Sequence, residues 1–486
     1  MSNDNLRAPQ SPKTPSTPLQ LDPSADEQRA LLEQAGERIV SYLATIGEQP
    51  THATDTGAQA RSWVDEPLPE KGMELTSVLQ PLFDQVIPCS LNTASPGYLA
   101  YVPGGGLFSA AVGEMIAASV NRYVGMWTAA PGAVELETQV IRWLGDMLQL
   151  PCGTLGVLTT GGSLSNWISV VTAREQLLPE DHASGVAYVS TEVHHSVTKA
   201  IRLAGIRRPL IRRVPVDDSF RMQVDRFEEM VEEDQARGLV PFFVCGSAGT
   251  VNTGSIDPLQ RIAAVARRKR LWFHVDAAYG GFFRIIPELN HAFAGLEEAD
   301  SISVDPHKGL FLAYGTGALL VKDISALHAA FSDDAEYLPD VESDSEHIDF
   351  AHISPELSRD WRGLRLWLPL KLHGVNAFRE ALKSKRELAC EAHEALRSRT
   401  DVEIATPPEL SLFAFRKLAP ERTDDEENHL NRELIQRINE SQRVLVTGTN
   451  IGGKEFIRLC VLHLRTDRAR VREATEIIHS ALDQMS

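Results

Sequence analysis

Short runs of consecutive apolar residues recur between about residues 106 and 322, and longer amphipathic stretches separate them. In most of these runs the apolar positions do not alternate with polar ones, which is typical of strands buried on both faces. The runs predict strands at Val186–Ser190, Pro241–Gly246, Leu271–Val275, Ser301–Val304 and Ala318–Val321.

The amphipathic stretches predict helices, two of which we place at Ser196–Ala204 and Asp257–Lys269. We expect the second helix to begin with Asp257 as its cap and Pro258 in its first turn. Helices that alternate with buried strands predict an α/β fold with a mostly parallel central sheet. Ligands of such sheets bind beyond the carboxyl ends of the strands, so candidate chemistry is expected there.

The N-terminal segment has a different pattern. Residues 1–23 are rich in Pro, Ser and Thr and predict a disordered tail. Ser24 and Glu27 form a capping box, and a second helix is expected from about Leu75 to Val86. The apolar face of the first helix would hold Leu32, Ala35, Ile39, Leu43 and Ile46. Residues 24–105 are too few to bury such faces alone, so we expect this segment to pack against a partner subunit.

The remaining pattern predicts two further domains. Residues 106–365 form the large α/β domain, within which the acidic, aperiodic stretch 331–360 predicts a mobile loop over the site. Residues 366–486 form a smaller α+β domain. Its expected elements are helices at about Asn376–Ser398, Asn428–Asn439 and from Asp467, and strands near Leu410–Phe415 and Phe456–Val461.

Composition excludes several classes of protein. The 486 residues are 43% hydrophobic without a long apolar run, which predicts a globular protein with no membrane span. The net charge of −18 argues against nucleic acid or an anionic membrane as a partner. The five cysteines show neither a CxxC motif nor metal-ligand spacing, and no signal peptide is visible. We therefore expect a cytoplasmic protein without a metal site.

Candidate chemistry begins where the strand Ser301–Val304 runs into Asp305-Pro-His-Lys308. Apolar surroundings disfavour the charged form of an amine, and a neutral lysine can attack a carbonyl and hold it as a Schiff base. The alternative is a surface lysine in a turn.

Three other segments carry candidate groups. Thr159–Asn166 places glycines and serines before a helical run, which favours a phosphate, although ordinary loops share this composition. Asp276 ends an apolar strand and needs a cationic partner, either a protonated pyridine nitrogen or an arginine. His194 and His195 follow another strand, where one could stack on a flat ring or cap a helix.

A phosphate site, a stacking histidine, an aspartate and a reactive lysine together match the needs of pyridoxal 5'-phosphate (PLP). The chain resembles the group II PLP-dependent amino-acid decarboxylases over about residues 75–465. The resemblance rests on HVDAAYGG (274–281), DPHK ending at Lys308, PGAVELE (131–137), TTGGSLSN (159–166) and RGLRLW (362–367).

The resemblance implies a role for each matching residue. Lys308 would bind PLP, Asp276 would pair with its ring nitrogen and His194 would stack on the ring. Tyr337 would protonate the substrate carbon after CO₂ leaves. The remaining cofactor contacts would come from Gly162, Ser163, Ala278 and His307, and candidate substrate contacts from Tyr101, Pro103, Tyr123 and Arg458. The family has the aminotransferase-like type I fold and forms homodimers with exchanged N-terminal segments.

Two departures from the family pattern matter. Asp305 stands where the animal aromatic enzymes have Asn, so a carboxylate facing the phosphate would need a compensating donor. Val102, Gly104 and Gly125 are smaller than their counterparts in the expected pocket. We expect decarboxylation of an L-amino acid, most readily an aromatic one. Open alternatives are an acidic substrate (glutamate, aspartate or cysteine sulfinate), for which Arg122 is the candidate cation, and a PLP-dependent aldehyde synthase or aminotransferase.

Overall fold

The computed structural model describes residues 21–53, 58–332 and 347–485. The chain divides into two compact units, one running up to Ile46 and including Ala53–Leu91, the other formed by Gly47–His52 and Asn92–Ser486. Most of the predicted tail lies outside the described residues. Tyr337 and its neighbours in 333–346 also lie outside them.

The first unit is helical. Helix α1 (Ala25–Ala44) begins at the predicted capping box, in which the Ser24 amide donates to Glu27 Oε2 at 2.8 Å. The predicted second helix is confirmed as α3 (Leu75–Pro81), which continues into the π-helical turn η1 (Leu82–Val86). A short helix, α2 (Ala58–Val64), was not predicted. The expectation for Ile46 was wrong in one respect, because α1 ends before this residue.

A seven-stranded sheet forms the centre of the second unit, with the order β1-β7-β6-β5-β4-β2-β3. The five predicted strands are confirmed as β2 (Gly185–Ser190), β4 (Val240–Ser247), β5 (Trp272–Asp276), β6 (Ser301–Val304) and β7 (Gly317–Val321). Two strands were not predicted, β1 (Leu155–Thr159) and β3 (Ile211–Val214). The neighbours from β6 to β3 are parallel, whereas β7 runs antiparallel to both β6 and β1. The expected type I α/β fold is therefore confirmed.

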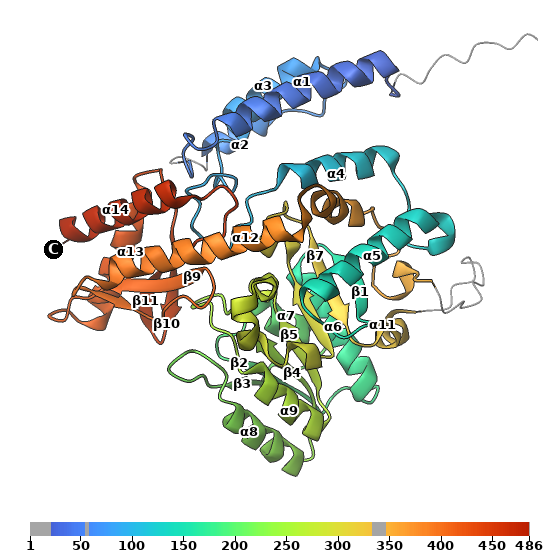
Figure 1. Ribbon diagram of the computed structural model, residues 1–486, viewed down its shortest axis with the longest axis vertical. Coiled ribbons are helices and arrows are strands. Elements are labelled where there is room, and N and C mark those ends of the chain that lie inside the picture. Colours follow the sequence, from blue (N-terminus) through green and yellow to red (C-terminus); the bar gives the residue numbers. More distant parts are fainter. Residues whose placement is uncertain (1–20, 54–57, 333–346, 486) are drawn as a thin grey trace, which may run out of the picture. The chain divides into compact units, whose positions relative to one another are not determined.

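Helices pack against this sheet (Figure 1). They include α5 (Pro131–Met147), α6 (Gly162–Leu177), α8 (Val224–Ala236) and α9 (Leu259–Lys269), while α7 (His195–Leu203) packs on α6. Other helices of the unit are α4 (Phe108–Val120), α10 (Pro306–Gly309) and α11 (Ile324–Phe331).

The predicted cap of α9 was wrong. The N-cap position is Pro258, one residue later than expected, and the helix runs from Leu259. The Asp257 carboxylate instead accepts the backbone N–H groups of Met222 and Ser247, each at 2.7 Å. These bonds join the start of α9 to the end of β4 and to the segment before α8, a long-range use of the side chain that local sequence does not reveal.

The C-terminal part has a four-stranded antiparallel sheet with the order β10-β11-β9-β8. Its strands are β8 (Val402–Ile404), β9 (Leu412–Lys417), β10 (Thr447–Ile451) and β11 (Lys454–Cys460). Its helices are α12 (Gly363–Arg397), α13 (Asp424–Asn439) and α14 (Arg468–Gln484). Helix α12 is interrupted at Gly374, which has a φ of 69°, and the helix predicted from Asn376 is the part beyond this break. The described helices include none with the length and apolarity to cross a membrane.

Candidate active site

A cavity of about 370 Å³ opens beyond the carboxyl ends of the central strands, where parallel sheets place their ligands. Each predicted cofactor residue lines it. Gly162 and Ser163 follow β1, and His194 follows β2. Asp276 ends β5 and Ala278 follows it, and His307 and Lys308 follow β6. The fold thus brings together residues that lie up to 146 positions apart in the sequence, the separation between Gly162 and Lys308.

The turn between β1 and α6 is shaped by glycines. Gly161 has a φ of 150°, which a residue with a side chain rarely adopts. A Cβ atom at Gly162 would lie 3.1 Å from the Ala278 Cβ and 3.2 Å from Asp305 Oδ2, so the backbone approaches the cavity closely. The Thr159 hydroxyl accepts the Gly161 N–H at 3.3 Å and bonds to the Ser165 hydroxyl at 2.8 Å. The N-terminus of α6, which favours anions, therefore faces the cavity from a braced turn.

Lys308 stands in the short helix α10, directly after the buried strand β6. Its Nζ lies 3.0 Å from Asp305 Oδ2, and Asp305 is only 2% exposed. The other carboxylate oxygen, Oδ1, is buried without a partner among the described residues. The negative charge that Asp305 brings in place of Asn is thus offset by the neighbouring Lys308. A surface lysine in a turn is excluded by this buried contact.

His307 borders the same carboxylate. Its Nε2 lies 3.7 Å from Asp305 Oδ2, and its Nδ1 donates to the Thr316 carbonyl at 2.8 Å. Burial lowers the pKa of His307, and the charge of Asp305 opposes this effect. The ring is held by its backbone contact, so its orientation toward the cavity does not depend on a ligand.

Asp276 is held by a network of neutral donors. Its Oδ2 accepts Asn166 Nδ2 at 3.2 Å, and its Oδ1 accepts the Ala278 N–H at 3.2 Å and the Ser303 hydroxyl at 3.4 Å. No Lys or Arg forms an ion pair with it in the described part of the chain. The alternative of a salt bridge to an arginine therefore finds no support, and the cavity contains a buried carboxylate that a cationic ligand atom can neutralise.

His274 and Asn166 extend this network. His274 Nε2 donates to Asn166 Oδ1 at 2.9 Å, and burial lowers the pKa of His274 to about 4, so its ring is neutral at physiological pH. Both residues were quoted in the sequence motifs but received no role. A signal was present for His274, because residues two apart on a strand share a face, and Asp276 stands two positions on.

His194 is the N-cap of α7. Its Nδ1 accepts the Ser196 N–H at 3.3 Å and lies 2.6 Å from the Ser196 hydroxyl. Burial lowers the pKa of His194, although Asp276 opposes this effect. The neutral ring therefore carries its proton on Nε2. The sequence left two roles open for a histidine at this position, a helix cap or a ring that stacks on the cofactor. His194 caps α7 and also lines the cavity, so the two roles are compatible.

The candidate substrate residues are not brought together in the same way. The residues lining the cavity include Val102 but none of Tyr101, Pro103, Tyr123 and Arg458. Arg458 is buried and donates to the Tyr101 carbonyl at 2.8 Å. Gly104 and Gly125 lie close to other atoms. A Cβ at Gly104 would lie 1.9 Å from the His307 carbonyl oxygen, and one at Gly125 2.3 Å from the Tyr123 hydroxyl.

The donor set fits PLP. The cavity offers a braced helix N-terminus for a phosphate, a lysine for an aldehyde and a carboxylate for a pyridinium, and the orphaned Asp305 Oδ1 can accept one further donor. A carboxylate and an incoming phosphate repel each other, and Lys308 supplies positive charge that opposes this repulsion.

Comparisons with known proteins agree with this chemistry. Residues 58–418 match the model of the pyridoxal-dependent decarboxylase conserved domain. An aromatic-L-amino-acid decarboxylase of Bacillus atrophaeus is 31% identical over 95% of this chain and 97% of its own. Among solved structures, the Oryza sativa protein TDC with PLP and tryptamine is 29% identical, with a TM-score of 0.92 over 96% of this chain and all of its own.

A second solved structure has a different activity in its name. The 4-hydroxyphenylacetaldehyde synthase of Rhodiola rosea is 26% identical, with a TM-score of 0.89 over 95% of this chain and 99% of its own. The family match covers most of the chain and includes every cofactor residue described above. The chain belongs to the pyridoxal-dependent decarboxylase family, and it is a PLP-dependent carboxy-lyase.

Proposed function

We propose that this enzyme decarboxylates an aromatic L-amino acid to the corresponding amine and CO₂. The observation that carries the proposal is the match of nearly the whole chain to an aromatic-L-amino-acid decarboxylase. The cavity is compatible with such a substrate, because apolar or aromatic side chains contribute to its wall. They are Val102, Leu164, Val251, Ala278, Tyr279 and Tyr314.

The charge of the cavity disfavours an acidic substrate. Among the described residues that line it, Lys308 is the only Lys or Arg, and its charge is already engaged by Asp305. Arg122, the candidate cation for a second carboxylate, is exposed and does not line the cavity. A buried side-chain carboxylate without a cation is costly, so glutamate, aspartate and cysteine sulfinate should be poor substrates.

The residues divide the work of the reaction. Bound PLP supplies the electron sink for the pair of electrons that the departing CO₂ leaves behind. Asp276 would hold a proton on the ring nitrogen. Asn166 and Ser303 each bind one oxygen of the Asp276 carboxylate. His194 would stack on the ring, and Lys308 would provide the amine that anchors the cofactor between turnovers. Tyr337 would protonate the substrate carbon, a role that stays a prediction because this residue lies outside the described ones.

An aldehyde synthase is the second candidate, because a solved relative bears that name. A decarboxylase releases amine and CO₂ after taking up one proton. An oxidative enzyme consumes O₂ and water and releases aldehyde, CO₂, ammonia and hydrogen peroxide. The predicted acid Tyr337 favours the first outcome, because prompt protonation removes the carbanion before O₂ can react.

One assay separates these candidates. The purified enzyme is given phenylalanine, tyrosine, tryptophan, glutamate, aspartate and cysteine sulfinate, and CO₂, amine, aldehyde and peroxide are measured together. We expect amine and CO₂ in equal amounts from at least one aromatic substrate. In Tyr337→Phe, amine formation should fall by about 10²–10⁴-fold, the contribution of a general acid, and aldehyde and peroxide should increase. Preferred turnover of an acidic substrate, or aldehyde as the main product of the unaltered enzyme, would refute the proposal.

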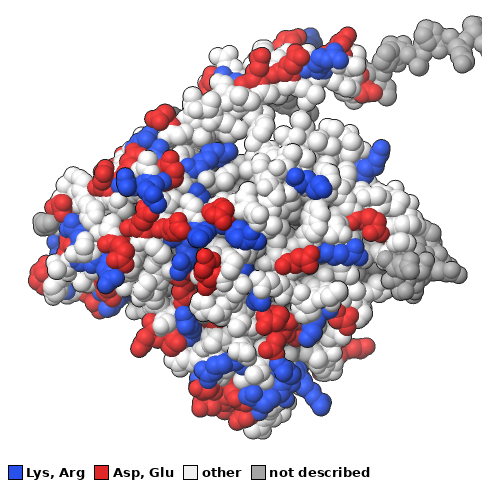
Figure 2. Space-filling view, viewed as in Figure 1, with Lys and Arg blue, Asp and Glu red and all other residues white. Residues whose placement is uncertain are grey.

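We also propose that the enzyme is a homodimer. Helix α1 has no buried residue, although apolar side chains recur along it. Helix α4 exposes Phe108, Met115, Ile116 and Val120 and contains a single charged residue, Glu114. Figure 2 shows few charged side chains over α4. Each of these two surfaces by itself is typical of an interface with a second copy of the chain.

A further inference from the structure

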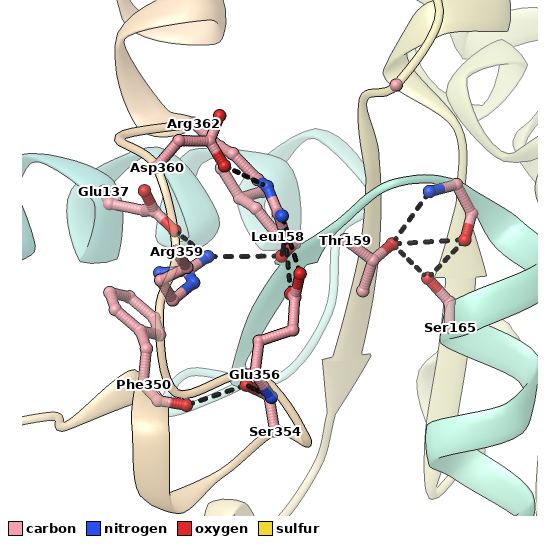
Figure 3. Close-up of polar contacts among 12 residues, drawn as sticks. Glu137, Leu158, Thr159, Ser165, Phe350, Ser354, Glu356, Arg359, Asp360 and Arg362 are labelled. Atoms are coloured by element: carbon pink, nitrogen blue, oxygen red, sulfur yellow. Dashed lines mark hydrogen bonds and ion pairs between the residues drawn. The ribbon is translucent and has the colours of Figure 1, made fainter. Parts of the chain in front are cut away.

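Two arginines that precede α12 converge on one backbone oxygen of the central sheet (Figure 3). Arg362 Nη1 donates to the Leu158 carbonyl at 3.0 Å, and Arg359 Nη2 donates to the same oxygen at 3.2 Å. Both guanidinium groups are almost fully buried, with side-chain exposures of 7% and 0%. The contacts link segments about 200 residues apart, as the separations of 204 and 201 positions show.

The oxygen that they bind lies at an edge of the sheet. Within the described residues, strand β1 pairs only with β7, so carbonyls on its outer side have no strand partner there. A buried carbonyl without a partner costs free energy, and charged donors form stronger hydrogen bonds than neutral ones. The two arginines therefore replace a missing strand at this position of β1.

The arginines are themselves fixed from the other side. Arg359 pairs with Glu137 of α5 at 2.6 Å, and both side chains are fully buried. The second oxygen of Glu137 accepts the Gly363 N–H at 2.9 Å, and Arg359 lies over the Phe350 ring, 4.5 Å from its centre. Arg362 is held by both oxygens of Glu356, at 2.6 and 2.7 Å. These contacts fix the positions of both guanidinium groups beside the Leu158 carbonyl.

Leu158 directly precedes the turn that faces the cofactor cavity. The next residue, Thr159, uses its hydroxyl to bind the Gly161 N–H and the Ser165 hydroxyl. Gly161, Gly162 and Ser163 then line the cavity. A shift of the Leu158 carbonyl would therefore displace the N-terminus of α6, because only two residues, Thr159 and Thr160, separate Leu158 from the glycines.

We propose that Arg359 and Arg362 are positioning residues for the phosphate-binding turn. They touch neither the cofactor nor the substrate; they hold the end of β1 so that the N–H groups after Thr159 remain aimed at a phosphate. The PGAVELE and RGLRLW motifs contribute Glu137 and Arg362, so both motifs would support the same phosphate-binding turn. Nothing in this proposal depends on which amino acid is decarboxylated.

Comparing ligands with and without a phosphate tests the proposal. The full-length protein is freed of cofactor, and its dissociation constants are measured by calorimetry for PLP, for pyridoxal and for inorganic phosphate. In Arg362→Gln we expect the constants for PLP and phosphate to rise about tenfold, equivalent to about 1.4 kcal/mol, while that for pyridoxal stays nearly unchanged. Glu356 is partly exposed, so solvent can compensate the charge of Glu356 when Arg362 is replaced.

Two further variants keep the result interpretable. Arg362→Lys and Arg359→Lys preserve the positive charge beside Glu356 and Glu137 but lose the planar pair of donors. Both variants should fold, and in both the affinity for PLP should fall more than the affinity for pyridoxal. Arg379→Gln is the matched control, because Arg379 of α12 also donates to a backbone carbonyl, that of Ile285 at 2.7 Å, away from the cofactor cavity. A PLP-to-pyridoxal ratio that is unchanged in the Arg359 and Arg362 variants, or changed equally in the control, would overturn the proposal.

Discussion

Asp276 carries a charge that the described protein groups around it do not neutralise. Its partners are an amide, a hydroxyl and a backbone N–H, all neutral donors that stabilise the carboxylate without supplying a positive charge. In the proposed mechanism the pyridinium of the cofactor would complete this arrangement, and the attraction would favour the protonated ring. The arrangement is electrostatic, so an isosteric neutral side chain should preserve its shape and remove its effect.

Asp276→Asn tests this interpretation. We expect the variant to fold and to retain PLP, while its rate of CO₂ release falls by about two to four powers of ten, since each pKa unit lost at the ring nitrogen corresponds to about 1.4 kcal/mol. Stopped assays of CO₂, with absorbance to quantify bound PLP, provide the measurement. Asp146→Asn, on the exposed side of α5, is the control. A rate close to that of the unaltered enzyme would assign Asp276 a structural role only.

The residues nearest the cofactor could be predicted because each stands in a short motif at a strand end. Lys308, Asp276 and Gly162 fall into this class, and the structure places all three at one cavity. Asn166 could not be assigned in the same way. Its partners Asp276, Ser196 and His274 come from other elements, 30 to 110 residues away, and only folding shows that they meet.

Strand burial decides which elements the sequence reveals. Every residue of β2, β5, β6 and β7 is buried, and most of the side chains in these strands are apolar. Strand β3 stands at an edge and has the sequence Ile-Arg-Arg-Val, and its polar centre hides it from a search for such runs. A similar limit explains Asp257, whose Asp-Pro pair has the local signature of a helix cap although its carboxylate binds backbone groups elsewhere.

The role of Asp257 as a link between elements has a measurable consequence. Both of its oxygens accept buried N–H groups, whereas the amide of Asp257→Asn has one accepting oxygen and would turn its NH₂ toward the other donor. We expect the free energy of unfolding to fall by about 1–3 kcal/mol, the cost of an unsatisfied buried donor. Urea titration followed by circular dichroism measures this value. The exposed control Asp146→Asn should change it by less than about 0.5 kcal/mol; an equal effect in both variants would contradict the role.

At the scale of the whole molecule, the N-terminal helices need an explanation that one chain does not provide. Leu32 and Ile39 of α1 are 56% and 39% exposed, although they belong to the apolar face predicted from the sequence. In a monomer, polar residues at these positions would be tolerated. In the proposed homodimer they would become buried and costly.

The double variant Leu32→Asp, Ile39→Asp distinguishes these cases. We expect the unaltered enzyme to sediment as a dimer, and the variant to sediment as a monomer and to lose PLP. Glu33→Gln, Glu37→Gln on the same helix is the matched control and should remain dimeric. Analytical ultracentrifugation with absorbance detection at the cofactor band records both properties. A variant that stays dimeric and yellow would show that this face of α1 is not part of an interface.

The two edges of the central sheet bear on aggregation through strand addition. An edge strand with free backbone groups is a template on which a strand of another molecule can add, the first step toward aggregates. At β1 the guanidinium groups of Arg359 and Arg362 already occupy the Leu158 oxygen. At β3, Arg212 and Arg213 place positive charge along the edge, and Arg212 is held by Asp234. Both borders of the seven-stranded sheet thus carry arginines, which oppose the addition of a further strand.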